Sequence, residues 1–181
     1  MPTAGDDDGA ERLAAHAAGN KRAWQATLDD VDELAAGRAT DGWEVVTVVA
    51  GQTAPRPRET GGTDRYGLVH VVSKSDADSF ATAYERGEYP RYDVYRATTD
   101  TRLFLVTECL DPGSRTAILV AGSVRRDDAR ALARTAARTG RMYTHVRTLD
   151  GTHLGSFEHA TPEKFFPVTD RGSQSSGEDC R

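Results

Sequence analysis

The stretch from Met142 to His159, MYTHVRTLDGTHLGSFEH, decides much of the predicted fold. Two runs of alternating side chains flank the dipeptide Asp150-Gly151, which is a favoured two-residue turn of a β-hairpin. We therefore predict paired strands over 142–149 and 152–159. The turn sets three facing pairs, which are Arg147 with Leu154, His145 with Ser156, and Tyr143 with Glu158.

One face of this hairpin carries the candidate binding residues. Successive side chains of a strand point to opposite faces, so the polar face holds Tyr143, His145, Arg147 and Glu158. The other face holds Met142, Val146 and Phe157, which suits a core. The polar face could hold an anion on Arg147 beside a general base, and it would equally suit a solvated sheet surface with cross-strand charge pairs.

Upstream of the hairpin, periodicity and turn residues predict alternating helices and strands. The expected elements are a helix near 24–35, strands at 43–50 and 66–72, a helix opening at Ser75 or Asp76, strands at 91–97, 103–110 and 116–121, and a helix from Asp127 or Asp128 to Gly140. The segment 51–64 is rich in proline and glycine and is predicted to be an exposed loop. This order is typical of an α+β fold, with a mostly antiparallel sheet and two or three helices packed on it.

The chain divides into one folded domain and two flanking segments. Residues 1–21 are expected to form a flexible acidic arm or a loosely held helix, 22–168 a single α+β domain, and 169–181 a disordered tail. Segments 65–110 and 116–161 share the order strand-helix-strand-strand, which suggests a tandem βαββ duplication. In that duplication Tyr92 and Arg96 would match Tyr143 and Arg147, so a binding site would be pseudo-symmetric.

The charge composition indicates a salt-adapted origin. The chain of 181 residues contains 18 Asp, 10 Glu and 20 Arg but only 3 Lys, with a net charge of −5. Net acidity argues against non-specific nucleic-acid binding by the whole protein. No apolar run approaches the roughly 20 residues of a membrane helix, and the acidic N-terminus is unlike a secretory signal. We therefore expect a cytoplasmic protein.

Several stretches of the chain resemble a known family. They include GWEVVTV at 42–48, GLVHVV at 67–72, PRYDVYR at 90–96, RMYTHV at 141–146, TLDGTHLGSFEH at 148–159 and PEKFFP at 162–167. Together they resemble a family of uncharacterised haloarchaeal proteins, a domain of unknown function, over about 24–168. The resemblance supports a halophilic, cytoplasmic protein and implies no activity, cofactor or site residue. From element order alone, an alternative architecture is that of roadblock-type regulatory domains with an added C-terminal hairpin.

A second candidate surface lies on the predicted third helix. Arg126, Arg130, Arg134 and Arg138 recur every four residues and form one stripe, opposite an apolar side with Leu132. A row of guanidinium groups suits phosphate contacts. The stripe would also suit an acidic protein partner, self-association or a plain solvated helix face.

Sequence motifs for common chemistries are absent. We find no Walker loop, dinucleotide-binding glycine motif, zinc-protease motif, serine-hydrolase elbow or Cys-x-x-Cys pair. His153 and His159 lie roughly 20 Å apart along an extended strand, so we expect no metal site; neither do we expect a cofactor or catalytic residues.

The sequence favours a non-enzymatic binding or regulatory module that acts through a protein partner or by forming a homodimer. One alternative is an RNA- or ribosome-associated protein that uses the helix 126–138. Another is a small enzyme with a polar site on the hairpin 141–159, which would require a concave pocket there.

Overall fold

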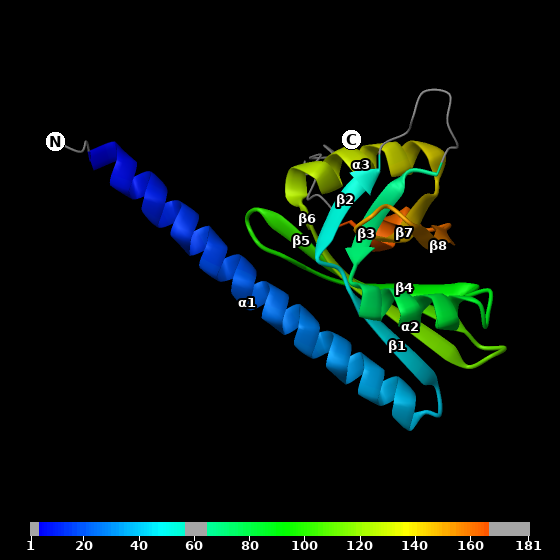
Figure 1. The fold of residues 1–181 in the computed structure, drawn as a ribbon. Helices are drawn as coiled ribbons and strands as arrows, with labels where there is room; N and C mark the ends of the chain where they lie inside the picture. Colours follow the sequence, from blue (N-terminus) through cyan, green and yellow to red (C-terminus); the bar gives the residue numbers. More distant parts are fainter. Residues whose placement is uncertain (1–3, 57–64, 167–181) are drawn as a thin grey trace, which may run out of the picture.

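The computed structural model describes residues 4–56 and 65–166 and confirms the α+β class. The described elements, shown in Figure 1, are α1 (Ala4–Thr40), β1 (Glu44–Val49), β2 (Gln52–Arg56), β3 (Gly67–Val72), α2 (Lys74–Tyr84), β4 (Arg91–Thr98), β5 (Arg102–Asp111), β6 (Thr116–Arg125), α3 (Arg126–Thr139), β7 (Met142–Thr148), β8 (His153–His159) and the short 3₁₀-helix η1 (Pro162–Lys164).

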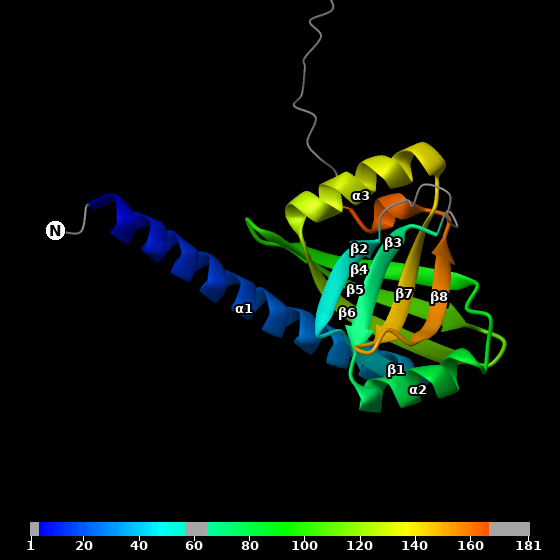
Figure 2. The same ribbon diagram turned by 45° about the horizontal axis from the view of Figure 1, so that its top comes forward.

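The strands form two four-stranded sheets rather than the single sheet that we expected (Figure 2). The first sheet has the order β1-β6-β5-β4, and the second sheet has the order β2-β3-β7-β8. Most pairs are antiparallel, but β1 pairs with β6 and β3 with β7 in parallel. Only Ala50 and Gly51 separate β1 from β2, so the chain passes from the first sheet to the second at this point.

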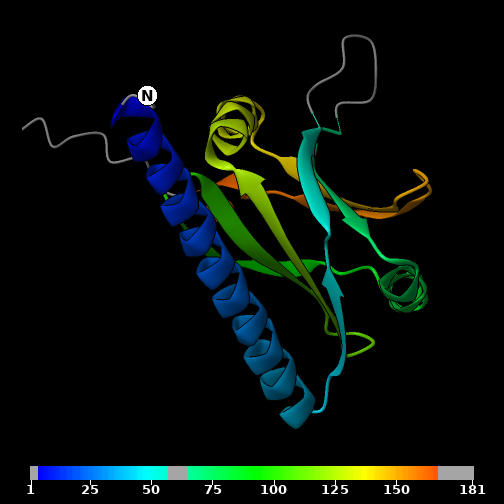
Figure 3. The same ribbon diagram turned by 60° about the vertical axis from the view of Figure 1, so that its left-hand side comes forward.

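Helix α1 covers the outer face of the first sheet (Figure 3). Leu28 and Val31 on its C-terminal half pack against Val106 of β5 and Leu119 of β6. The N-terminal part of the helix extends beyond the sheet (Figure 1), and Leu13 there is 71% exposed. Helix α1 therefore covers the outer face of the first sheet and not that of the second.

A buried ion pair joins α1 to the first sheet. Glu108 of β5 is fully buried and accepts two hydrogen bonds from Arg38, with Nε–Oε2 at 3.0 Å and Nη2–Oε1 at 2.8 Å. The Arg38 guanidinium also lies 5.5 Å from the centre of the Trp43 ring. A bidentate contact of this kind restricts the orientation of α1 relative to β5.

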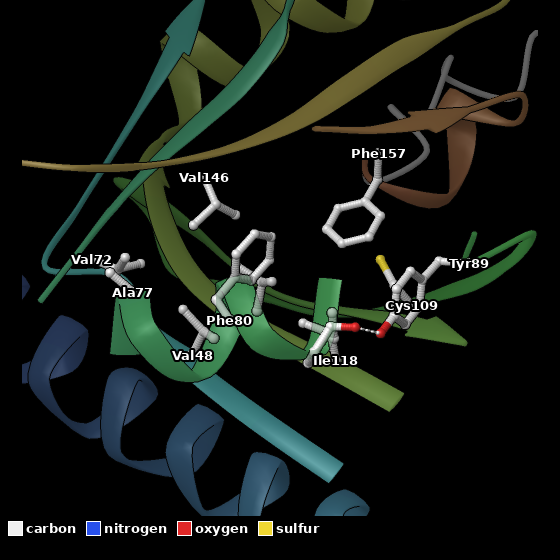
Figure 4. Packing of buried hydrophobic residues seen from close by; sticks show 11 residues of the cluster. Val48, Val72, Ala77, Phe80, Tyr89, Cys109, Ile118, Val146 and Phe157 are labelled. Carbon is white, nitrogen blue, oxygen red and sulfur yellow. Dashed lines mark hydrogen bonds between the residues drawn. The ribbon is translucent and has the colours of Figure 1, made fainter. Parts of the chain in front are cut away.

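Helix α2 closes one end of the space between the two sheets. Its Phe80 packs with Val72 and Val146 of the second sheet and with Val48 and Ile118 of the first (Figure 4). The helix starts one residue after Ser73, whose hydroxyl accepts a hydrogen bond from the Asp76 amide. The cap is thus slightly earlier than the predicted Ser75 or Asp76.

Helix α3 closes the opposite end. Leu132 packs with Leu68 of the second sheet and Leu105 of the first, while Phe165 after η1 completes this cluster. The helix ends as predicted at Gly140, which has a φ of 71°, a left-handed conformation that glycine adopts without strain. Because α2 and α3 both contact inward-facing residues, neither lies over the outer face of the second sheet.

Two segments differ from the sequence-based expectation. Residues 4–21, for which we expected a flexible arm or a loosely held helix, are helical and continuous with the rest of α1; their many alanines favour a helix even without an apolar stripe. Within the predicted loop 51–64, residues 52–56 form β2, at the edge of the second sheet, where Pro55 is tolerated. Residues 57–64 and the predicted tail 169–181 lie outside the described residues.

The two units of the suggested duplication share their element order but not their strand pairing. In the first unit the hairpin β4-β5 pairs with β6 in antiparallel fashion, through β5. In the second unit the hairpin β7-β8 pairs with β3 in parallel, through β7. The strand pairing therefore does not support the duplication, which stays a prediction.

Candidate functional site

The outer face of the second sheet, here called the open face, contains the predicted hairpin residues. The strand registers place side chains in three rows across β2, β3, β7 and β8. The rows are Arg56, Gly67, Tyr143 and Glu158, then Ala54, Val69, His145 and Ser156, and finally Gln52, Val71, Arg147 and His153. The inner face carries Met142, Val146 and Phe157, all buried, as predicted.

The hairpin register is mostly the predicted one. His145 faces Ser156 and Tyr143 faces Glu158, as expected. Arg147 faces His153 rather than the predicted Leu154, because a β-bulge follows Val146. The bulge brings the His153 ring to 5.9 Å from the His145 ring, between centroids.

A chain of hydrogen bonds runs through the middle of the open face. His145 Nε2 lies 2.8 Å from the carbonyl oxygen of Arg65, to which it must donate. Its Nδ1 is then an acceptor in the neutral ring, and it takes the hydroxyl proton of Ser156 at 2.6 Å. Ser156 Oγ in turn accepts from His153 Nε2 at 3.1 Å. These bonds place the proton of the neutral His145 ring on Nε2, and they require a proton on Nε2 of His153.

Positive charge surrounds His145. Burial lowers the pKa of His145 most strongly, the Arg65 carbonyl opposes this, and the charges of Arg56, His153 and Arg65 lower it further. The Arg65 guanidinium lies 5.8 Å from the centre of the Tyr143 ring, which stacks on His145 with 5.8 Å between centroids and 10° between planes. His145 is therefore a neutral ring held rigidly within a cationic surface.

Three arginines of this surface have no ion-pair partner among the described residues. Among the described residues, no carboxylate forms an ion pair with Arg56, Arg65 or Arg147. Glu158 is exposed at one end of the first row. Our sequence analysis missed Arg56 and Arg65, because they lie in or beside the segment expected to be a loop. The alternation of Gln52, Ala54 and Arg56 with Thr53 and Pro55 was the only signal for a strand.

Tyr92 and Arg96 lie elsewhere, on β4 of the first sheet. The Tyr92 hydroxyl accepts a hydrogen bond from the Thr161 amide at 2.8 Å. Arg96 Nη1 donates to the carbonyl oxygens of Glu163 and Lys164 at 3.1 and 2.9 Å. The structure thus does not bring them to the open face, and they hold the segment around η1 against the domain.

The arginine stripe of α3 is only partly free. Arg126 donates to the Thr99 carbonyl, and Arg130 pairs with Asp127 at 3.2 Å. Arg134 and Arg138 are exposed. The opposite side, with Leu132, is buried as predicted.

Two further histidines are buried between the sheets. His70 Nδ1 lies 3.0 Å from Thr53 Oγ1, and His159 Nε2 lies 2.8 Å from Thr144 Oγ1. The second ring nitrogen of each has no hydrogen-bond partner among the described residues. Burial lowers the pKa of His70 to about 4 and that of His159 to about 3, so both rings are neutral. In the described part of the chain, no group of three or more potential ligands could hold a metal ion.

Two grooves lie beside other parts of the molecule, and of the open-face residues just Gln52 lines one of them. One, of about 510 Å³, lies beside α1 and includes Asp30, Glu33, Arg38 and Tyr95. The other, of about 360 Å³, lies where β1 passes into β2 and includes Trp24, Thr53 and Arg102. Neither contains His145, Arg147 or Glu158, so these two grooves do not supply the pocket that an enzyme on the hairpin would require.

Comparisons with known proteins give a family but no activity. None of the described helices is long and apolar enough to cross a membrane. No curated protein and no solved structure matches the chain. A family model matches residues 10–167, which include every described strand and most of α1. The chain therefore belongs to a family of unknown function, DUF7529.

Proposed function

We propose that this protein is a binding module that takes an acidic segment of a protein partner on the open face. The observation that carries the proposal is the contrast between the two sheets. Helix α1 covers the outer face of the first sheet, whereas none of the described helices covers that of the second. An exposed surface that combines apolar area with a polar rim is a frequent site of association.

The chemistry of the open face favours an acidic partner. Arg56, Arg65 and Arg147 are cations without a carboxylate among the described residues, in a chain whose net charge is −5. Half-buried Val69 and Val71 add apolar area between them. Arginine in such a setting binds a carboxylate through two parallel hydrogen bonds.

The proposal includes a cytoplasmic, salt-adapted setting. The scarcity of lysine and the resemblance to haloarchaeal proteins support it. Molar salt screens exposed charges beyond about 3 Å, so the contact must combine direct arginine–carboxylate bonds with apolar burial. The rigid Tyr143–His145 stack beside Arg65 offers such a mixed surface.

Binding of a fluorescein-labelled decaglutamate peptide, followed by fluorescence anisotropy, tests the proposal. The variant Arg56→Gln/Arg65→Gln/Arg147→Gln should bind at least tenfold more weakly than the unmodified protein, because each charge-assisted bond contributes about 1.5–3 kcal/mol. The matched control Arg130→Gln/Arg134→Gln/Arg138→Gln removes the same charge from α3 and should bind normally. Equal losses in both variants would show non-specific attraction and contradict the proposal.

The same two variants distinguish binding of an acidic segment from the alternative, binding of RNA on α3. The exposed Arg134 and Arg138 of α3 are the observation in its favour. If a labelled RNA binds more tightly than the decaglutamate peptide, and only the α3 variant loses it, α3 is the working surface. A homodimer detected by light scattering that the open-face variant abolishes would instead identify a second copy as the partner.

A further inference from the structure

We infer that the groove at the passage from β1 to β2 is a second binding site, for a small organic anion with a flat apolar body. The groove measures about 360 Å³, a volume in the range of small-ligand sites. It is lined by Trp24 of α1, the segment Val49–Thr53, Arg102 of β5 and Ser123 of β6. It lies between α1 and the sheets, and it shares Gln52 with the third row of the open face.

Arg102 supplies a positioned cation. Its Nε donates to Ser123 Oγ at 2.6 Å and its Nη2 to the Ser123 carbonyl oxygen at 2.9 Å. These two bonds hold one edge of the guanidinium, and Nη1 has no hydrogen-bond partner in the described part of the chain. No carboxylate among the described residues pairs with Arg102. A half-buried guanidinium that is fixed but not neutralised suits an anion.

The Thr53 hydroxyl supplies a second donor to the groove. This follows from its hydrogen bond with the buried His70. If Thr53 donated to His70 Nδ1, the N–H on His70 Nε2 would be buried without an acceptor. Orphaned N–H groups are rarer in proteins than under-satisfied acceptors. The favoured arrangement has His70 Nδ1 donating to Thr53 Oγ1, which leaves the Thr53 hydroxyl proton free for an acceptor in the groove.

Apolar side chains line another part of the groove, alongside the polar Gln52 and Ser123. Trp24 is half-buried, packs on Phe104 with 6.3 Å between ring centroids, and forms a wall of the groove. Val49 in the same groove is 36% exposed. A flat apolar body against the indole and a carboxylate toward Arg102 and Thr53 would use every one of these groups. His70 is a positioning residue in this arrangement, since it acts through Thr53.

Tryptophan fluorescence can test this site directly. The chain contains two tryptophans, so in Trp43→Phe all tryptophan emission comes from Trp24. Titration of this protein with benzoate should give a saturable change in emission. Benzamide, which is neutral and nearly the same shape, should bind at least tenfold more weakly, and benzylamine should not bind.

Two further substitutions, each in the Trp43→Phe background, separate the donors. Thr53→Val removes the hydroxyl and should weaken benzoate binding, while Thr53→Ser keeps it and should bind normally. Arg102→Gln should abolish binding, and Arg134→Gln on α3 should leave it unchanged; circular dichroism checks that each variant is folded. The inference is wrong if benzoate gives no saturable change, if benzamide binds equally well, or if Thr53→Val binds as tightly as Thr53→Ser. These variants leave Arg56, Arg65 and Arg147 unchanged, so a negative result here would not contradict the binding of an acidic segment on the open face.

Discussion

Gly122 of β6 and His70 of β3 touch across the space between the two sheets. A β-carbon on Gly122 would lie 2.6 Å from His70 Nδ1, closer than any real side-chain contact, and it would also overlap the Thr53 hydroxyl. The absence of a side chain at this one position lets the polar pair of the second sheet fit against the backbone of the first. The two sheets therefore pack in close contact at the point where β1 passes into β2.

Gly122→Ala should therefore destabilise the protein by about 1–3 kcal/mol, the usual cost of overpacking a core. Denaturant unfolding gives the change in free energy. Gly37→Ala is the matched control, since Gly37 is helical and nothing lies within 4 Å of its added β-carbon; it should raise stability by up to about 1 kcal/mol. Equal effects of the two substitutions would refute the close approach.

The ion pair between Arg38 and Glu108 should behave as a buried one. Arg38→Met leaves the fully buried Glu108 carboxylate unpaired and should cost about 3 kcal/mol of stability. The double variant Arg38→Met/Glu108→Leu should recover much of this loss of stability, because it also removes the unpaired, buried carboxylate. A double variant that is less stable than Arg38→Met would contradict this account.

Stability should fall in mild acid because His70 and His159 are buried as neutral rings. Their pKa values of about 4 and about 3 in the folded state lie below the value near 6.5 of an unfolded chain. The unfolded state thus binds more protons between pH 6.5 and 4, and stability falls as pH decreases through this window. The slope is roughly 1.4 kcal/mol per pH unit for each histidine, with little change above pH 7.

Urea unfolding at pH 7.0, 5.5 and 4.5 measures this slope. In the variant His70→Gln/His159→Gln the fall between pH 6.5 and 4.5 should be much smaller. If the variant and the unmodified protein show the same slope, other groups cause the acid sensitivity.

The pKa of His145 should report the positive charge of the open face. Because Arg56 contributes to lowering it, Arg56→Gln should raise the pKa of His145, whereas Arg134→Gln on α3 should not change it. NMR titration of the imidazole resonances measures the shift. If the pKa of His145 is unchanged in Arg56→Gln, the Arg56 charge does not contribute to lowering it.

Local signals were sufficient for much of the fold. Asp150-Gly151 and the flanking alternation predicted the hairpin, two of its three facing pairs and its buried face, because a two-residue turn sets the register. Gly140 likewise predicted the end of α3. The bulge after Val146 has no such local signal, so the pairing of Arg147 with His153 could not be predicted.

The candidate site was less accessible to sequence reasoning because it depends on distant pairings. Arg56 comes beside Tyr143 only because β2 pairs with β3 and β3 pairs with β7. Pro55 made β2 resemble a loop, so Arg56 was not expected to lie in the same sheet as the hairpin. Tyr92 and Arg96 were matched to the hairpin by the suggested duplication, whereas the structure places them against η1.

NMR mapping of the acidic peptide tests the central claim most directly. Decaglutamate is added to ¹⁵N-labelled protein, and the change in each backbone amide resonance is recorded. The account predicts that the largest shifts fall on the open face, at Gly67, Tyr143, His145, Arg147 and Ser156, with little change along α3. Shifts concentrated on Arg134 and Arg138, or spread evenly over the surface, would contradict the open face as the binding surface.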